Sequence, residues 1–314
     1  MEQFLTPPQP TSLGVGERPT ITELLKRNAA LVIAHPGHEL CVYGWLTLAK
    51  PTLFVLTDGS GRTGMSRLSS TARIMAEVGA RKSTWFGRHT DQVVYEALLG
   101  HDTGFFCDLA EQLADALQTT GVEYVVGDSI EGYNPTHDVC RMLINTAVTL
   151  VNQRGEKQIQ NFDFPIIGRS LPGESVTLKL DGPGFHRKME VMRSYPELAD
   201  EVSVGLDGAI LKKLNHLGDF GREIKGLIQS RGGADFFREE SFRPVSIDES
   251  TGLMPNLQIE TAKPYYERYA EILVAAGHYQ QVIRYVDHLY PVAEALHDLA
   301  INATVPTLEC AASA

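Results

Sequence analysis

Cysteine is scarce in this chain of 314 residues: four are present, and no two stand in a CxxC pair. The scarcity excludes a disulfide framework and a cysteine-rich structural zinc site, and it is typical of a cytosolic protein with reduced thiols. The chain also has no apolar run of membrane-spanning length, and no basic start followed by an apolar stretch that would indicate a secretory signal. We therefore expect a cytoplasmic protein without a membrane partner.

Basic residues are outnumbered by acidic ones, with 28 Lys and Arg against 39 Asp and Glu and a net charge of −11. A chain this acidic lacks the positive surface that attracts nucleic acid or anionic membranes. The expected partner is a small-molecule substrate. Tyrosines at helical spacing near the C-terminal end favour helix packing, with a homo-oligomer interface as the alternative.

Strand-like and helix-like stretches alternate along the first half of the chain. The expected strands are Ala30–Ala34, Thr52–Thr57, Ser83–Phe86 and Val122–Gly127, and the expected helices are Glu39–Ala49, Leu68–Gly79, Phe105–Thr120 and His137–Asn152. This alternation predicts an α/β, Rossmann-like fold, mainly a parallel sheet with helices on both faces.

The remaining sequence is less regular: Phe162–Arg169 and Ser175–Leu180 are candidate strands, and the part after Gly205 is mostly helical. Its last helical region, Pro264–Leu299, is expected to be interrupted near Gly277 and Pro291. We predict three parts: an N-terminal lead-in (1–29), an α/β catalytic domain (30–200) and a mostly helical C-terminal extension packed on it (201–314).

Three histidines follow two of the expected strands. His35 and His38 flank a Pro-Gly turn after the first strand, and His137 ends the loop after Val122–Gly127. Neutral imidazole is the commonest protein metal ligand, and the carboxyl ends of parallel strands meet at one edge of a sheet. Three ligands and an open fourth position are typical of catalytic zinc, although Fe²⁺ also suits such a site. The alternative for each histidine is an ordinary polar residue at a strand end.

The motif AHPGHE at residues 34–39 resembles the AHPDDE signature of the PIG-L (LmbE-like) N-deacetylases. Phe54–Ser60 is similar to the Thr-Asp-Gly segment on that family's second strand, and Asn134–His137 resembles its distal HPDH motif. The resemblance covers residues 30–195. It implies a zinc-dependent hydrolase of a C–N bond, deacylating an amino-sugar-like or small amine metabolite through metal-activated water. By resemblance His35 and His137 are zinc ligands, and His38 replaces the family's aspartate ligand.

Two positions depart from the family pattern. Gly37 stands in place of the aspartate that acts as general base, and Asn134 stands in place of the first distal histidine. Glycine has no group for proton transfer, whereas asparagine can donate a hydrogen bond to an oxyanion. We expect Glu131 to act as the substitute base, with Asp58 next. The alternatives are a different hydrolytic or lyase reaction and a non-catalytic metal- or ligand-binding protein.

Other polar residues around these loops are candidates for supporting roles. Arg62 and Arg67 could hold an anionic part of a substrate, and Tyr133 could place a phenol at the rim of the site. Glu39 and Asp138 are expected to orient the ligand histidines.

A competing pattern is the GxGxxG match at Gly59–Gly64, which would indicate a nucleotide-dependent enzyme. The match follows the second strand instead of the first, and no acidic residue closes the next expected strand, Ser83–Phe86. We therefore prefer an active-site loop or a surface turn for this segment.

Overall fold

The computed structural model describes residues 19–61, 64–155, 158–166, 174–198, 237–245 and 263–303. Within these ranges a seven-stranded sheet has the order β3-β2-β1-β4-β5-β7-β6. The parallel strands are β1 (Ala29–Ile33), β2 (Thr52–Thr57), β3 (Arg81–His89), β4 (Tyr124–Asp128) and β5 (Gln160–Phe164). Two antiparallel pairings add β7 (Glu239–Pro244) and β6 (Val176–Lys179) at one edge. The predicted α/β fold with a mainly parallel sheet is confirmed.

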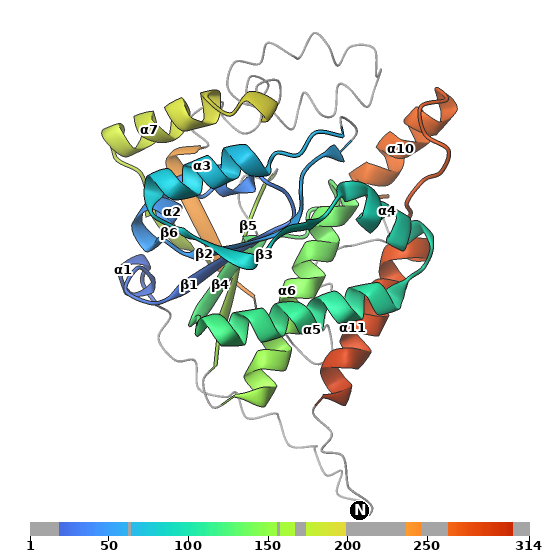
Figure 1. Ribbon diagram of the computed structural model, residues 1–314, viewed down its shortest axis with the longest axis horizontal. Helices are drawn as coiled ribbons and strands as arrows, with labels where there is room; N and C mark the ends of the chain where they lie inside the picture. The colour runs from blue at the N-terminus through green and yellow to red at the C-terminus, as the bar shows by residue number, and fades with distance from the viewer. Residues whose placement is uncertain are drawn as a thin grey trace, which may run out of the picture.

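Helices cover both faces of the sheet (Figure 1). One face carries α1 (Ile21–Leu24), α2 (Tyr43–Ala49), α3 (Leu68–Val78) and α7 (Gly182–Arg193). The other carries α4 (Asp91–Leu99), α5 (Thr103–Thr120), α6 (Pro135–Arg154), the π-helical η6 (Tyr285–Leu289) and α11 (Tyr290–Asn302). A further helix, α10 (Tyr265–Ala275), lies beside α4 in Figure 1.

The central strand β1 explains this layering. Its five residues are all buried, and successive side chains point to opposite faces of the sheet. Ala30 and Val32 belong to the core on the α5 and α6 side, whereas Leu31 and Ile33 belong to the core on the α2 and α3 side. A strand buried on both faces reads as a continuous apolar run, which is why the sequence predicts it.

The direction in which the sheet is built reverses at β1. The chain proceeds outward from β1 through β2 to β3, then returns to place β4 on the other side of β1. Beyond the carboxyl ends of two such strands the connecting loops diverge and leave a crevice where open α/β sheets bind ligands. The loops that carry His35, His38 and His137 start here.

Several expected boundaries are corrected by the structure. The third strand extends to His89, three residues beyond Ser83–Phe86, and α4 follows it where the sequence predicts no helix. Gly277, with φ +77°, ends the α10 segment as expected. Pro291 does not interrupt a helix: it is the second residue of α11, where a missing N–H costs no hydrogen bond.

The C-terminal part is not only helical, because β7 pairs with β5 and β6. Glu240 on β7 forms a fully buried ion pair with Lys188 of α7, with 2.7 Å between Nζ and Oε1. The same carboxylate accepts hydrogen bonds from the N–H groups of Gly44 and Trp45 at the start of α2. The strand β7, which lies within 201–314, therefore belongs to the same sheet as the strands of the α/β domain.

None of the helices in these ranges combines the length and the apolar character needed to cross a membrane.

Candidate metal centre

The three predicted ligands come together at the switch point of the sheet. His35 follows β1, His38 begins the short helix η1 (His38–Leu40), and His137 lies in the first turn of α6. Their ring centroids are 5.3 Å apart for His35 and His38, 5.0 Å for His35 and His137, and 4.4 Å for His38 and His137. Imidazoles bound to one zinc ion, each through a nitrogen about 2 Å from the metal, have centroids about 5 Å apart. The observed spacing suits one ion.

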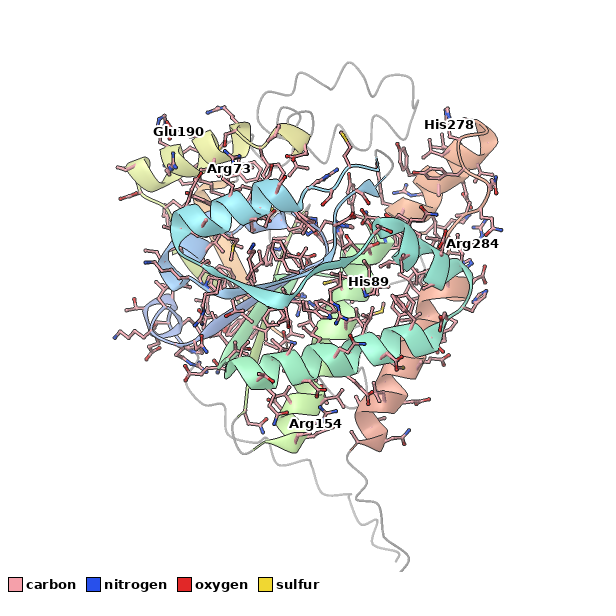
Figure 2. The ribbon with its side chains drawn as sticks, viewed as in Figure 1. Arg73, His89, Arg154, Glu190, His278 and Arg284 are labelled. Atoms are coloured by element: carbon pink, nitrogen blue, oxygen red, sulfur yellow. The ribbon has the colours of Figure 1, made fainter. Side chains whose placement is uncertain are left out.

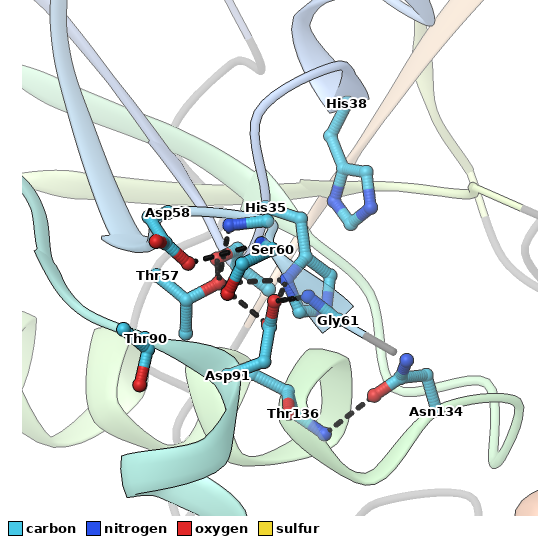
Figure 3. A network of polar contacts seen from close by, with 12 residues as sticks. His35, His38, Thr57, Asp58, Ser60, Gly61, Thr90, Asp91, Asn134 and Thr136 are labelled. Atoms are coloured by element: carbon cyan, nitrogen blue, oxygen red, sulfur yellow. Dashed lines mark hydrogen bonds and ion pairs between the residues drawn. The ribbon is translucent and has the colours of Figure 1, made fainter. Parts of the chain in front are cut away.

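Two buried carboxylates fix the orientation of two of these rings. Nδ1 of His35 lies 2.9 Å from Oδ1 of Asp91 and 2.8 Å from the hydroxyl of Thr57, which itself donates to Asp91. Figure 3 shows this group at the end of β2 and the start of α4. Nδ1 of His38 lies 2.9 Å from Oδ2 of Asp128, the last residue of β4. Both rings can therefore donate Nδ1–H and leave Nε2 as the lone-pair nitrogen.

The remaining ring nitrogens support a metal-binding role. Nε2 of His35 and Nδ1 of His137 are buried and have no hydrogen-bond partner among the residues described. Burial, with the neighbouring His38 and His35, holds the pKa of His137 well below its usual range. A buried polar atom without a partner is costly unless a ligand or ion satisfies it. Two buried imidazole nitrogens without a partner, beside the third imidazole of His38, are a donor set suited to a divalent metal.

As the side chains stand, no group of three His, Cys, Asp or Glu residues in the described ranges is arranged to hold a metal ion. The rings cross one another at 61° to 89°. The residue types, the spacing of the rings and the buried nitrogens nevertheless fit a metal.

Gly37 occupies a position that disfavours any residue with a side chain. Its φ is +108°, and a Cβ atom there would lie 2.3 Å from Cδ1 of Leu198, with the Tyr195 ring also in contact range. Leu198 ends the short helix η3 (Pro196–Leu198). The space beside Gly37 is therefore filled by an apolar side chain, and a carboxylate could not take its place without displacing Leu198.

Glu39 and Asp138 do not orient the histidines, contrary to prediction. Glu39 accepts hydrogen bonds from the N–H of Gly37 and from the Thr71 hydroxyl, and burial raises its pKa to about 7. Asp138 accepts the N–H groups of Glu131 and Gly132, and burial likewise raises its pKa to about 7. Each acid shapes one of the two histidine loops.

The three predicted catalytic residues lie on the loops around the histidines. Glu131 is half-buried, and its Oε2 accepts the N–H of Ile166 at 2.8 Å. Asn134 is the N-cap of α6, with its Oδ1 accepting the N–H of Thr136 at 2.8 Å (Figure 3). Asp58 follows β2, and its Oδ1 accepts the N–H of Ser60. The catalytic roles of these three residues stay predictions.

The predicted substrate-binding residues are placed differently from one another. Tyr133 lies at the rim, its ring 6.3 Å from that of His137 and stacked on Tyr265 at 4.8 Å. Arg67 immediately precedes α3, and its main-chain carbonyl accepts the Tyr195 hydroxyl. Arg62 lies outside the described residues. Tyr133 thus lies beside His137 of the histidine cluster.

The other described histidines belong elsewhere. His89 packs its ring against Phe105, and His101 stacks on His288. His278 is exposed at the outer end of the α10 segment (Figure 2).

Asp91 and Asp128 are the site residues that the sequence reasoning missed. Asp91 comes two residues after the true end of β3, and Asp128 is the last residue of β4. An acid at the carboxyl end of each strand of a parallel sheet was the available signal, obscured by ending both strands too early. The Asp91 carboxylate also accepts the N–H of Gly61, so the GxGxxG loop is tied to the histidine site.

Fold and site together define an α/β protein with a cluster of three histidines, two of them buried, at the switch point of its sheet. No family model and no curated protein matches the chain. Among solved structures it is similar to an A40926 pseudoaglycone deacetylase, at 17% identity and TM-score 0.44, covering 69% of this chain and 97% of that one.

Two further similar structures are deacetylases connected with teicoplanin. One acts in the biosynthesis pathway of teicoplanin and matches at 12% identity and TM-score 0.44, over 70% of this chain and 98% of that one. The other is a zinc-inhibited form of a teicoplanin deacetylase, at 10% identity and TM-score 0.39, over 70% and 100%. These are distant likenesses of fold, and the evidence on function comes from the residues of the site.

Proposed function

We propose that this protein is a zinc-dependent hydrolase of a C–N bond, acting by N-deacylation of an amino-sugar-like or small amine metabolite. The observation that carries the proposal is the cluster of three imidazoles, of which His35 and His137 are buried and His38 is partly buried, with His35 and His38 held at Nδ1 by carboxylates. Carboxylate–histidine pairs of this kind are typical of metal sites, because they fix the ring and its tautomer.

His35, His38 and His137 would hold the ion. A zinc ion with three protein ligands supplies Lewis-acid polarisation and lowers the pKa of a water molecule. Asp91 and Asp128 keep the Nδ1 protons of His35 and His38 in place, so that Nε2 of each ring is available. The buried position of His137 keeps its ring neutral, which ligation requires.

The remaining chemistry needs a proton acceptor and a hydrogen-bond donor. We assign the role of proton acceptor to the carboxylate of Glu131, which lies in the loop that leads into α6. Asn134 uses Oδ1 to cap α6, so its Nδ2 is the atom that would donate to the oxyanion. The stack of Tyr133 on Tyr265 would contact the substrate beside His137.

The test is elemental analysis of protein purified without chelator, followed by hydrolysis assays on N-acetylated amino sugars and amines. We expect one zinc or iron ion per chain in the wild type, loss of that ion in His137→Ala, and amine release that depends on it. In Glu131→Gln the metal should stay and the rate should fall at unchanged substrate binding. The matched variant is Asp58→Asn, which removes the carboxylate of the second candidate base. Wild-type protein that stays metal-free after incubation with zinc would exclude the mechanism.

A second function is favoured by one observation: the base position is a glycine packed against Leu198. A metal- or ligand-binding protein without turnover would retain the histidines and lack this base. It predicts metal binding in the wild type and no amine release from any N-acyl compound, and Glu131→Gln would then change neither.

A further inference from the structure

A buried cation lies directly behind the candidate metal centre. Arg141 is 2% exposed and stands one helical turn after His137 on α6. Burial lowers the pKa of its guanidinium, and the carboxylate of Asp163 is the first of the charges that oppose this effect. Burying a charged side chain is costly unless its hydrogen bonds are satisfied. The contacts of Arg141 therefore indicate what this cation does.

The guanidinium joins the last residue of β4 to two residues within β5. Nε donates to the main-chain carbonyl of Asp128 at 2.5 Å, and Nη2 donates to the carbonyl of Phe162 at 3.1 Å. Nη1 donates to Oδ1 of Asn161 at 2.9 Å and approaches Oδ1 of Asn145 at 3.5 Å. The bond to Asp128 is the important one, because the side chain of that residue holds Nδ1 of His38.

Gly127 leaves space for the side chain of Arg141 where that side chain passes β4. A Cβ atom at that position would lie 2.9 Å from Nη2 of Arg141, 2.6 Å from the carbonyl oxygen of Val32 and 2.5 Å from Cδ1 of Ile144. The side chain of Arg141 thus passes against the backbone of β4 immediately before Asp128. A glycine inside a buried strand is otherwise unfavourable, since it adds no packing.

We propose that Arg141 is a positioning residue of the three-histidine site, which fixes Asp128 and through it the orientation and tautomer of His38. Helix α6 then sets two of the three rings: His137 directly, and His38 through Arg141 and Asp128. This inference rests on the proposed metal-binding function for its consequence, but the effect on His38 exists in the metal-free protein.

The first measurement is the tautomer of His38 in metal-free protein labelled with ¹⁵N-histidine, read by long-range ¹H–¹⁵N correlation and assigned with His38→Gln. We expect Nδ1–H in the wild type and a mixture of tautomers in Arg141→Met. The second measurement is the zinc dissociation constant from competition with a chromophoric chelator. Arg141→Met should raise it about 10- to 100-fold, as loss of an outer partner of a metal ligand does.

The matched control is Arg243→Met. Arg243 is a second arginine beside β5: it lies on β7 and pairs with Asp163 of β5. Arg243→Met should lower the stability of the fold and leave the His38 tautomer and the zinc dissociation constant unchanged. If Arg141→Met fails to fold, Arg141→Lys decides, because lysine keeps the charge without the fork and should show the same two changes at smaller size.

The positioning role would be overturned if the folded Arg141 variants kept the wild-type His38 tautomer and zinc dissociation constant. It would also be overturned if Arg243→Met changed both quantities equally. Wild-type protein that binds no zinc, with a tautomer change confined to the Arg141 variants, would contradict the metal function while supporting the positioning of His38.

Discussion

Single side chains decide which nitrogen each histidine offers. An imidazole has two ring nitrogens, and the partner of one determines the state of the other. Asp91 and Asp128 each occupy an Nδ1, so the Nε2 atoms of His35 and His38 are directed away from the sheet edge that holds the carboxylates. Removing one carboxylate should free the ring without removing the ligand.

We expect Asp91→Asn to raise the zinc dissociation constant about 10- to 100-fold, because the amide orients His35 less strongly than the carboxylate. Chelator competition measures this. Asp163→Asn is the control, since Asp163 pairs with Arg243 and lies on β5. Equal affinity in Asp91→Asn and the wild type would contradict an orienting role.

Gly37 should resist substitution more than a glycine with similar backbone freedom. Gly37→Ala places a methyl group on Leu198 at a φ of +108°, whereas Gly64→Ala, at φ +67°, meets no described atom within 4 Å. We expect Gly37→Ala to lose about 1–3 kcal/mol more stability than Gly64→Ala. Urea unfolding gives both values. Leu198→Ala should recover part of the loss in the double variant, and equal losses in the two alanine variants would refute the packing argument.

Helix α6 is the element on which the site depends most. Its N-cap Asn134, its first-turn His137 and its second-turn Arg141 serve the cap, the ligand set and the strand ends. Asn134 therefore has two proposed roles, one in stability and one in stabilising an oxyanion. Different substitutions separate them.

We expect Asn134→Ala to lose about 1 kcal/mol of stability, because the cap is removed. Asn134→Asp keeps an oxygen for the N–H of Thr136 and places a negative charge at a helix N-terminus, so stability should stay near the wild-type value. Its kcat should still fall about 100- to 1000-fold, since a carboxylate cannot donate to an oxyanion. Urea unfolding and initial rates check the pair. An active, stable Asn134→Asp would show that Asn134 is only a cap.

The whole molecule brings distant segments to one crevice. The reversal of strand order at β1 places the loop after β1 beside the loop after β4, and β3 adds Asp91 from the other side. A metal bound at this point would connect two loops that are far apart in the sequence, so it should stabilise the native state as a unit.

We expect zinc at 100 times its dissociation constant to add about 2.7 kcal/mol to the free energy of unfolding. Thermal unfolding should show a higher Tm with zinc and a lower Tm after chelation. His137→Ala should show no shift with either treatment. An equal shift in that variant would place the binding site elsewhere on the chain.

The sequence by itself determined the layered α/β architecture and the three histidines. Apolar runs of strand length alternating with amphipathic stretches leave few other folds, because a strand buried on both faces needs helices on both sides. The candidate ligands were recognisable because each follows such a run. Gly37 and Asn134 were also identifiable as departures, since the resemblance assigns a residue type to each position.

Only the tertiary structure decided which carboxylates serve the histidines. Glu39 and Asp138 are adjacent to ligands in sequence, yet their carboxylates face the backbone of their own loops. Asp91 and Asp128 are remote in sequence and reach His35 and His38 from neighbouring strand ends. The strand β7 and the buried Arg141 were hidden for the same reason: pairing partners and buried hydrogen bonds depend on contacts between distant segments, which local patterns do not encode.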